Sequence, residues 1–142
     1  GVIMKSLGLD WGSKTLGVAI SDELGIIASP VGTFNFNEYQ LQEALEYVKI
    51  LVAKHNIKKI VLGLAKNMDG SIGFQGQYTL KFKDMLIEQL ALEVVMVDER
   101  LTSRMAEQVM LEADLSRKKR KTKVDQLAAT IILQSYLDSI KK

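Results

Sequence analysis

Asp10 is the first of three acidic residues whose positions suggest metal chemistry. It ends the strand-like run Ser6–Leu9, and Gly12 follows two positions later. A carboxylate at the end of a central strand, with a small residue nearby that lets a ligand approach the backbone, is a common way to hold Mg²⁺ against a phosphate. We therefore take Asp10 as the first candidate metal ligand.

A second acidic group, Asp98-Glu99-Arg100, follows the strand-like run Val94–Val97. Successive strand residues point to opposite faces, so only one of the two carboxylates can readily face the Asp10 site. We assign that role to Glu99. The alternative is that both acids are simply solvated at a strand end, which is the commoner outcome for any one acidic pair. Arg100 would contact a phosphate or support the carboxylate, and the sequence leaves both open.

Asp125 supplies the third carboxylate, near the start of the last predicted helix. It begins an apolar stripe at three- and four-residue steps that continues through Ala129 and Tyr136. An alternative is that Thr122 and Asp125 form an N-terminal capping box, because acids are favoured at helix N-termini. Taken alone, Asp125 fits capping and catalysis equally well.

The three carboxylates support one another as a metal site. Three acids in one crevice would repel each other strongly unless divalent cations neutralised them. Two Mg²⁺ or Mn²⁺ ions held by Asp10, Glu99 and Asp125 would activate a water and stabilise the leaving oxygen in phosphodiester hydrolysis. A zinc centre is poorly supplied, because the chain has no cysteine and a single histidine, His55, at a predicted helix end.

Positive charge is concentrated in one segment, 117–123, which we expect to be a loop. The whole chain carries a net charge of +2, and the six basic residues of this segment leave −4 for the remainder. A solvated loop is the plain interpretation. Because the segment leads directly into the helix that bears Asp125, contact with a nucleic-acid backbone is favoured. The basic residues are Arg117, Lys118, Lys119, Arg120, Lys121 and Lys123.

A glycine-rich loop, Ala65–Gly76, supplies further candidate contacts. Its glycines allow close backbone approach, while Lys66, Asn67 and Ser71 are donors suited to phosphate oxygens. Selection for turn geometry explains the glycines equally well. Lys14, in the turn after Asp10, completes the predicted substrate contacts. Trp11 would stack on a base or, as is commoner for a tryptophan in a turn, pack against its own domain.

The composition indicates one globular domain spanning residues 1–142. This length can bury a single core but cannot form two lobes around a cleft. Hydrophobic residues make up 47% and charged residues 25% of the chain, and no apolar run approaches the roughly 18 residues of a membrane span. The absence of cysteine excludes disulfides and a cysteine nucleophile.

The order of the predicted elements indicates an α/β fold. Three strands form an antiparallel meander, and strand–helix–strand crossovers then add parallel strands, giving a mixed sheet with helices on both faces. The predicted strands are 5–10, 15–21, 26–36, 59–64 and 93–97, and the predicted helices are 41–54, one containing 78–90, 102–113 and 123–140. Crevices in such sheets lie outside the carboxyl ends of the parallel strands, where the polar residues gather.

Four motifs, in order, resemble the YqgF family, whose members are described as pre-16S rRNA nucleases and as Holliday junction resolvases. The motifs are Leu9–Asp22, Val61–Leu64 with Asn67–Ser71, Val97–Ser103 and Lys123–Ala129. The resemblance implies a ribonuclease H-like fold, a bacterial cytoplasmic protein, and catalytic carboxylates at Asp10, Glu99 and Asp125. One departure is Ala65, where the family commonly shows proline.

Three functions from different classes follow. The first is a metal-dependent endonuclease acting on structured nucleic acid, with precursor 16S rRNA preferred to four-way DNA junctions because of the resemblance. The second is a sugar kinase or actin-like ATPase, whose phosphate loop is similar to the motif around Asp10 and Thr15, although one lobe is too small for such a protein. The third is a non-catalytic RNA-binding factor in ribosome assembly. We expect a monomer or a weak homodimer, because trimming one RNA end needs only one active site.

Overall fold

A computed structural model describes residues 5–12, 14–64, 69–98 and 117–140 of the protein, with 117–126 described by backbone alone. The predicted helix at 102–113 lies outside these ranges. No helix in the described part is both long and apolar enough to cross a membrane.

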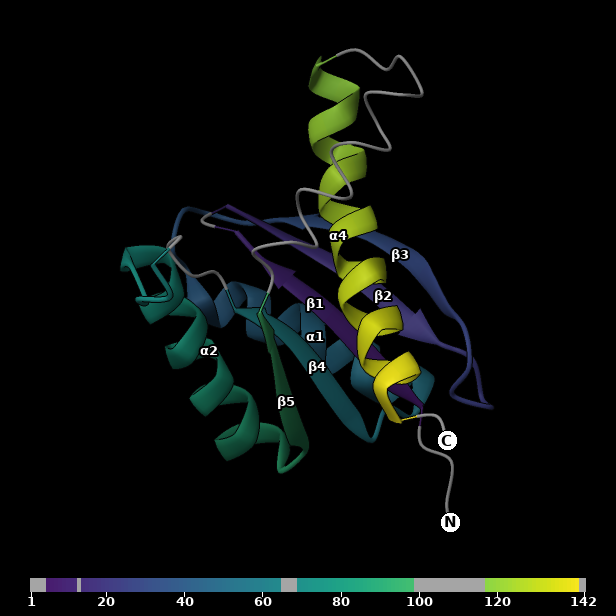
Figure 1. Ribbon diagram of the computed structural model, residues 1–142. Coiled ribbons are helices and arrows are strands. Elements are labelled where there is room, and N and C mark those ends of the chain that lie inside the picture. Colours follow the sequence, from purple (N-terminus) through teal and green to yellow (C-terminus); the bar gives the residue numbers. More distant parts are fainter. Residues whose placement is uncertain (1–4, 13, 65–68, 99–116, 141–142) are drawn as a thin grey trace.

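A mixed five-stranded sheet forms the centre of the fold, with strand order β3-β2-β1-β4-β5 (Figure 1). The first three strands pair antiparallel, and β4 and β5 extend the sheet through parallel pairing with β1 and with each other. This confirms the predicted α/β class and the predicted meander. The strands are β1 (Ser6–Trp11), β2 (Thr15–Ser21), β3 (Ala28–Asn35), β4 (Lys59–Leu64) and β5 (Glu93–Asp98).

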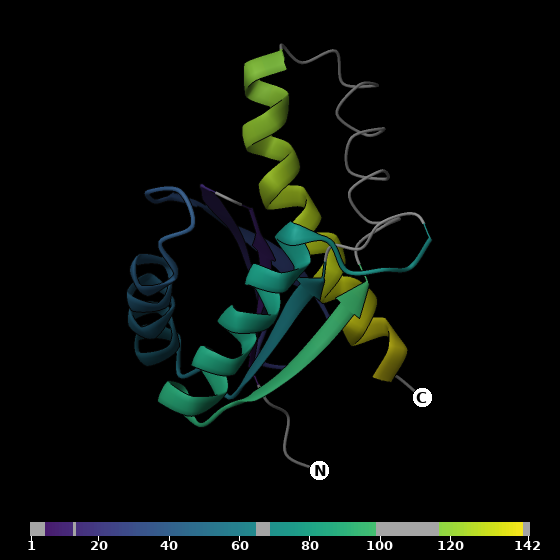
Figure 2. The same cartoon turned by 90° about the vertical axis from the view of Figure 1, so that its left-hand side faces the viewer.

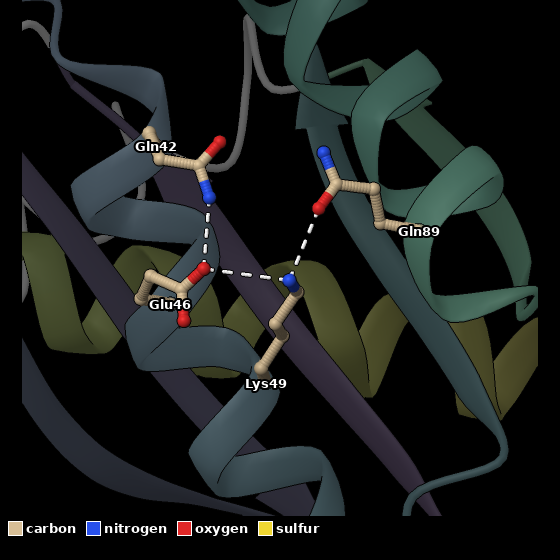
Figure 3. A network of polar contacts seen from close by, with 4 residues as sticks. All are labelled: Gln42, Glu46, Lys49 and Gln89. Carbon is tan, nitrogen blue, oxygen red and sulfur yellow. Dashed lines mark hydrogen bonds and ion pairs between the residues drawn. The ribbon is translucent and has the colours of Figure 1, made fainter.

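Helices cover both faces of the sheet, as predicted. α1 (Leu41–His55) and α2 (Phe74–Leu90) lie on one face, and α4 (Arg117–Ile140) crosses the other (Figures 1 and 2). Asn56 ends α1 in the left-handed conformation expected of it. Lys49 of α1 donates a hydrogen bond to Gln89 of α2 at 3.0 Å, which ties the two helices together (Figure 3). Lys49 also pairs with Glu46 within α1.

Strand alternation divides the core into two clusters of different character. On the face of α1 and α2, the strands contribute large side chains such as Leu9 and Leu62, which pack with Leu45 and Phe82. On the face of α4, they contribute small or short side chains, and the helix supplies the larger ones. The members of this second cluster are Ala19, Ala28, Val61, Ala129, Ile132, Leu133 and Leu137.

The small strand residues let α4 approach the sheet closely. A Cβ atom added at Gly8 would lie 2.7 Å from Leu133 Cβ and 3.0 Å from the Ala129 carbonyl oxygen. Farther along the helix, the Lys59 ammonium group at the start of β4 donates a hydrogen bond to the Tyr136 hydroxyl at 2.6 Å. The helix therefore runs antiparallel to β1, and its residues before Ala129 lead toward the carboxyl end of β1.

The basic segment 117–123 lies in α4, so the prediction of a basic loop was wrong. The helix begins at Arg117, six residues before the predicted start at Lys123. Arg and Lys are good helix formers, and that preference outweighs the repulsion between neighbouring cations. Thr122 and Asp125 consequently lie inside the helix, and the capping-box interpretation of Asp125 is also wrong.

Candidate active site at the carboxyl edge of the sheet

Asp10 lies on the face of the sheet that α4 covers. In the strand register it pairs with Gly17 of β2 on one side and with Gly63 of β4 on the other. Directly paired residues share a face, and their side chains are neighbours. Asp10 is partly exposed and both glycines are buried. The carboxylate is therefore flanked on both neighbouring strands by residues without a side chain.

Gly17 and Gly63 are site residues that the sequence reasoning missed. Both were visible as glycines inside strand-like runs, a pattern that often marks close approach of a ligand or of another backbone. The information that the sequence lacks is the register, which places both of them beside Asp10. Gly12 has a separate role in the β1–β2 turn, where its N–H donates to the Thr15 carbonyl at 2.7 Å and an added Cβ would lie 2.8 Å from Thr15 Oγ1.

Asp98 and Glu99 differ in their placement. Val94 and Met96 of β5 pack into the cluster beneath α1 and α2, whereas Val97 packs into the cluster beneath α4. By alternation, Asp98 belongs to the α1 and α2 face, opposite to Asp10. The assignment of the second carboxylate to Glu99 rather than Asp98 is consistent with this, but Glu99 and Arg100 lie outside the described residues.

Asp125 is placed by the backbone of α4. It precedes Ala129 by one helical turn, and the Ala129 carbonyl lies against Gly8. Asp10 is two residues beyond Gly8 on the same face of β1, so both acids lie beyond the Gly8–Ala129 contact in the same direction. The backbone thus brings Asp125 toward the edge of the sheet that carries Asp10. The basic residues of 117–123 occupy the first two turns of the same helix.

The predicted phosphate donors outside α4 are only partly described. Lys14 is exposed in the turn after β1, on the same edge of the sheet as Asp10. Ser71 is exposed, and both its backbone N–H and its hydroxyl donate to Asp69 Oδ1, at 2.9 and 2.6 Å. Ser71 therefore has a local role in the loop, while Lys66 and Asn67 lie outside the described residues.

Trp11 packs inside the protein, so the alternative that it stacks on a base was wrong. Its side chain is 2% exposed, with ring centroids 4.9 Å from Phe36 and 5.0 Å from Phe82. Its carbonyl oxygen accepts a hydrogen bond from the Gln75 side chain at 3.2 Å, which fixes the start of α2 beside the residue that follows Asp10. No sequence pattern indicated this role of Gln75.

The donor chemistry at the site suits a hard cation. The carboxylate of Asp10 is partly exposed between two glycines, and oxygen donors of this kind are those that Mg²⁺ and Mn²⁺ prefer. Among the residues with described side chains, no three acidic, histidine or cysteine residues gather as a metal site. Two of the three predicted ligands, Glu99 and Asp125, fall outside that set.

The sheet topology and helix placement define a ribonuclease H-like fold, which solved structures of resolvases share. A Thermus thermophilus RuvC in complex with a Holliday junction substrate matches with a TM-score of 0.61 at 13% identity, over 97% of this chain and 98% of that one. The Fowlpox virus resolvase in complex with Holliday junction DNA matches with a TM-score of 0.57 at 16% identity, over 98% and 100%. At these identities the likeness shows the fold alone.

Residues 4–139 match the family described as "RuvX: Holliday junction resolvase". Two relatives, each named "Putative pre-16S rRNA nuclease", come from Staphylococcus haemolyticus (48% identical over 138 residues, 96% of this chain and 97% of the relative) and Bacillus cytotoxicus (49% over 136 residues, 96% and 99%). The chain belongs to this family, the YqgF family expected from its motifs, and is a nuclease of the hydrolase class.

Proposed function

We propose that the protein is a metal-dependent endonuclease that processes the 5′ end of precursor 16S rRNA during ribosome biogenesis in the bacterial cytoplasm. The single domain would cut one phosphodiester bond with one active site. The observation that carries the proposal is the position of Asp10 at the carboxyl end of the central strand, paired with Gly17 and Gly63. It lies on the face of the sheet that α4 crosses, and the backbone of α4 leads Asp125 toward the same end.

The metal would be held by Asp10, Glu99 and Asp125. Mg²⁺ or Mn²⁺ bound there would lower the pKa of a water and neutralise charge that develops on the phosphate. Asp10 contributes a carboxylate on a central strand, and the residues paired with it on both neighbouring strands, Gly17 and Gly63, have no side chain that would compete with a phosphate for it. The basic first turns of α4, with Lys14, would attract the nucleic-acid backbone and offset its repulsion by the acids.

The RNA substrate is preferred because of the relatives. Those that are 48% and 49% identical over nearly the full length are named for precursor 16S rRNA, whereas the junction-bound structures are 13% and 16% identical. The family description favours a second candidate, resolution of four-way DNA junctions. Junction resolution requires two symmetric cuts and therefore a dimer.

The test incubates the purified protein with Mg²⁺ or Mn²⁺ and two labelled substrates, a precursor 16S rRNA 5′ segment and a synthetic four-way DNA junction. Wild type and Asp10→Asn are compared on both. We expect cleavage of the RNA that the substitution abolishes. Symmetric cutting of the junction would select the second candidate. Binding without cleavage, unchanged by Asp10→Asn, would instead identify a non-catalytic assembly factor.

A further inference from the structure

Three aromatic side chains gather at the margin of the core, at the start of α2. Tyr39 and Tyr78 stack with ring centroids 4.3 Å apart, and Phe74 meets them at interplanar angles of 83° and 69°, with centroids 5.3 and 5.1 Å away. Phe74 is the first residue of α2, whereas Tyr39 lies in the connection between β3 and α1. Two distant segments of the chain thus fix the orientation of one phenylalanine ring.

Phe74 is nevertheless 66% exposed, more than any other large hydrophobic side chain in the described residues. The two tyrosines are partly buried. A single exposed apolar residue is ordinary on a protein surface. Here, however, the ring is held by two edge-to-face contacts, so it is both open to solvent and preorganised.

The backbone at Tyr39 adopts an uncommon conformation that brings this cluster together. Its φ is +58°, a left-handed value that is rare and strained for a bulky residue. The adjoining turn is closed by a hydrogen bond from the Gln40 N–H to the Asn37 carbonyl at 2.9 Å, and the Asn37 side chain donates to Glu43 at 3.1 Å. Strain of this kind concentrates at binding sites.

The aromatic cluster lies at the same carboxyl edge of the sheet as the candidate active site, on the face that α1 and α2 cover. Gln75, the residue after Phe74, donates its side-chain hydrogen bond to the Trp11 carbonyl at 3.2 Å, and Trp11 follows Asp10. Figure 2 shows α2 beginning at the end of the sheet where β4 and β5 end. A cation is also present, since Lys81 Nζ lies 5.1 Å from the centroid of the Tyr78 ring.

We propose that Phe74, oriented by Tyr39 and Tyr78, is a stacking surface for an unpaired base of RNA next to the bond that is cut. Every base presents a π face, so such a surface is tolerant of sequence, and Lys81 would attract the adjoining phosphate. The inference deepens the proposed function and rests on it for the identity of the ligand. A surface that takes an unpaired base discriminates single-stranded ends from continuous duplex.

The test measures binding separately from cleavage. The Asp10→Asn protein is titrated into a short single-stranded RNA containing 2-aminopurine, whose fluorescence falls when the base stacks, and into the matching duplex. Phe74→Leu removes the ring and keeps an apolar side chain, whereas Phe74→Tyr keeps the ring. Ile50→Ala, on α1 and 63% exposed, is the matched control for loss of exposed apolar surface.

We expect Phe74→Leu to weaken single-strand binding by roughly 5- to 150-fold and to abolish the quenching, as found for removal of one base–aromatic stack. Phe74→Tyr should retain both, Ile50→Ala should match its parent, and duplex binding should change little in every variant. Circular dichroism and thermal melting would show that the variants are folded.

The proposal is overturned if Phe74→Leu binds the single strand as its parent does, or if it weakens duplex and single strand equally. Tighter binding of single-stranded DNA than of RNA would overturn the assignment to RNA. Failure of the proposed function would look different. The wild type would then cut neither substrate, while Phe74→Leu could still weaken the binding of single-stranded RNA. Conversely, cleavage that depends on Asp10 but not on Phe74 would preserve the nuclease and remove the stacking surface.

Discussion

The two faces of the sheet are built from strand side chains of different size. Beneath α1 and α2 the strands present leucine, isoleucine and tryptophan side chains, which fill the space between the sheet and two helices. Beneath α4 they present glycine, alanine and valine, so that this helix approaches the strand backbone closely. The first face is suited to burying apolar area, which is the main source of stability.

The small-residue face has polar groups at both of its ends. Asp10 lies at the carboxyl edge of the sheet, and Lys59 lies at the opposite edge, where it contacts Tyr136 of α4 and Glu93 of β5. The close approach of α4 at Gly8 lies between them. We infer that one face mainly stabilises the protein, while the other sets the position of a helix relative to Asp10, the candidate catalytic carboxylate.

The largest expected effect is the difference in cleavage rate between two variants whose acids end strands on opposite faces of the sheet. Asp10→Asn should reduce cleavage roughly a thousandfold or more, because a metal site stabilises the transition state by several kcal/mol and 1.36 kcal/mol is tenfold in rate. Asp98→Asn, on the opposite face, should leave the rate within a few fold. Single-turnover cleavage with Mg²⁺ measures both. Equal losses in the two variants would contradict the assignment of faces.

On the face of α1 and α2, Leu45→Ala should lower the free energy of unfolding by about 2–5 kcal/mol, since the side chain is fully buried among large neighbours. Urea denaturation measures this loss. At a temperature where the variant is fully folded, its cleavage rate should equal that of the wild type. A folded but inactive Leu45→Ala protein would show that this face also positions the site.

On the face of α4, Gly8→Ala should lower the free energy of unfolding by about 1–3 kcal/mol through overpacking. The new methyl group would meet a Cβ atom and a backbone carbonyl, 2.7 and 3.0 Å away, and neither can rotate aside. The helix must move, so cleavage should fall in the folded protein as well. Retention of both stability and activity would mean that the position of α4 is not critical.

Much of the sheet was predictable from the sequence because its signals are local. Short β-like or apolar runs bounded by turns located all five strands, and the helical period with Asn56 located α1. The start of α4 was missed because six neighbouring cations were taken to indicate a loop, although Arg and Lys favour helices. In this case intrinsic propensity was the better guide than charge.

The candidate site was less predictable because it depends on contacts distant in sequence. Asp10 was recognisable from its place at a strand end, but the pairing that puts Gly17 and Gly63 beside it is a property of the register. Phe74 fell within the segment Ala65–Gly76, which was predicted to be a loop, although α2 begins at this residue. Its ring contact with Tyr39, 35 residues earlier in the chain, depends on the fold and has no signal in the sequence.

The smallest expected effect concerns the polar contact at the far end of the α4 face. Burial lowers the pKa of Lys59, but hydrogen bonds to the Tyr136 hydroxyl and the Glu93 carboxylate outweigh it and hold that pKa above the ordinary 10.5. A raised pKa in the folded state means that the charged lysine stabilises the fold fully below pH 10.5 and progressively less as the pH rises through the folded value.

Lys59→Met should therefore lower the free energy of unfolding at neutral pH by about 1.5 kcal/mol, the lower end of the range for a hydrogen bond to a charged group. The difference from wild type should shrink above pH 10.5. Lys58→Met, at an exposed neighbouring position, should show neither effect. Denaturation across this pH range measures the stability of both variants. Because Lys59 lies at the edge of the sheet opposite to Asp10, cleavage by the folded Lys59→Met protein should match that of the wild type. A loss of cleavage would mean that the end of α4 with Tyr136 also governs the position of the end with Asp125.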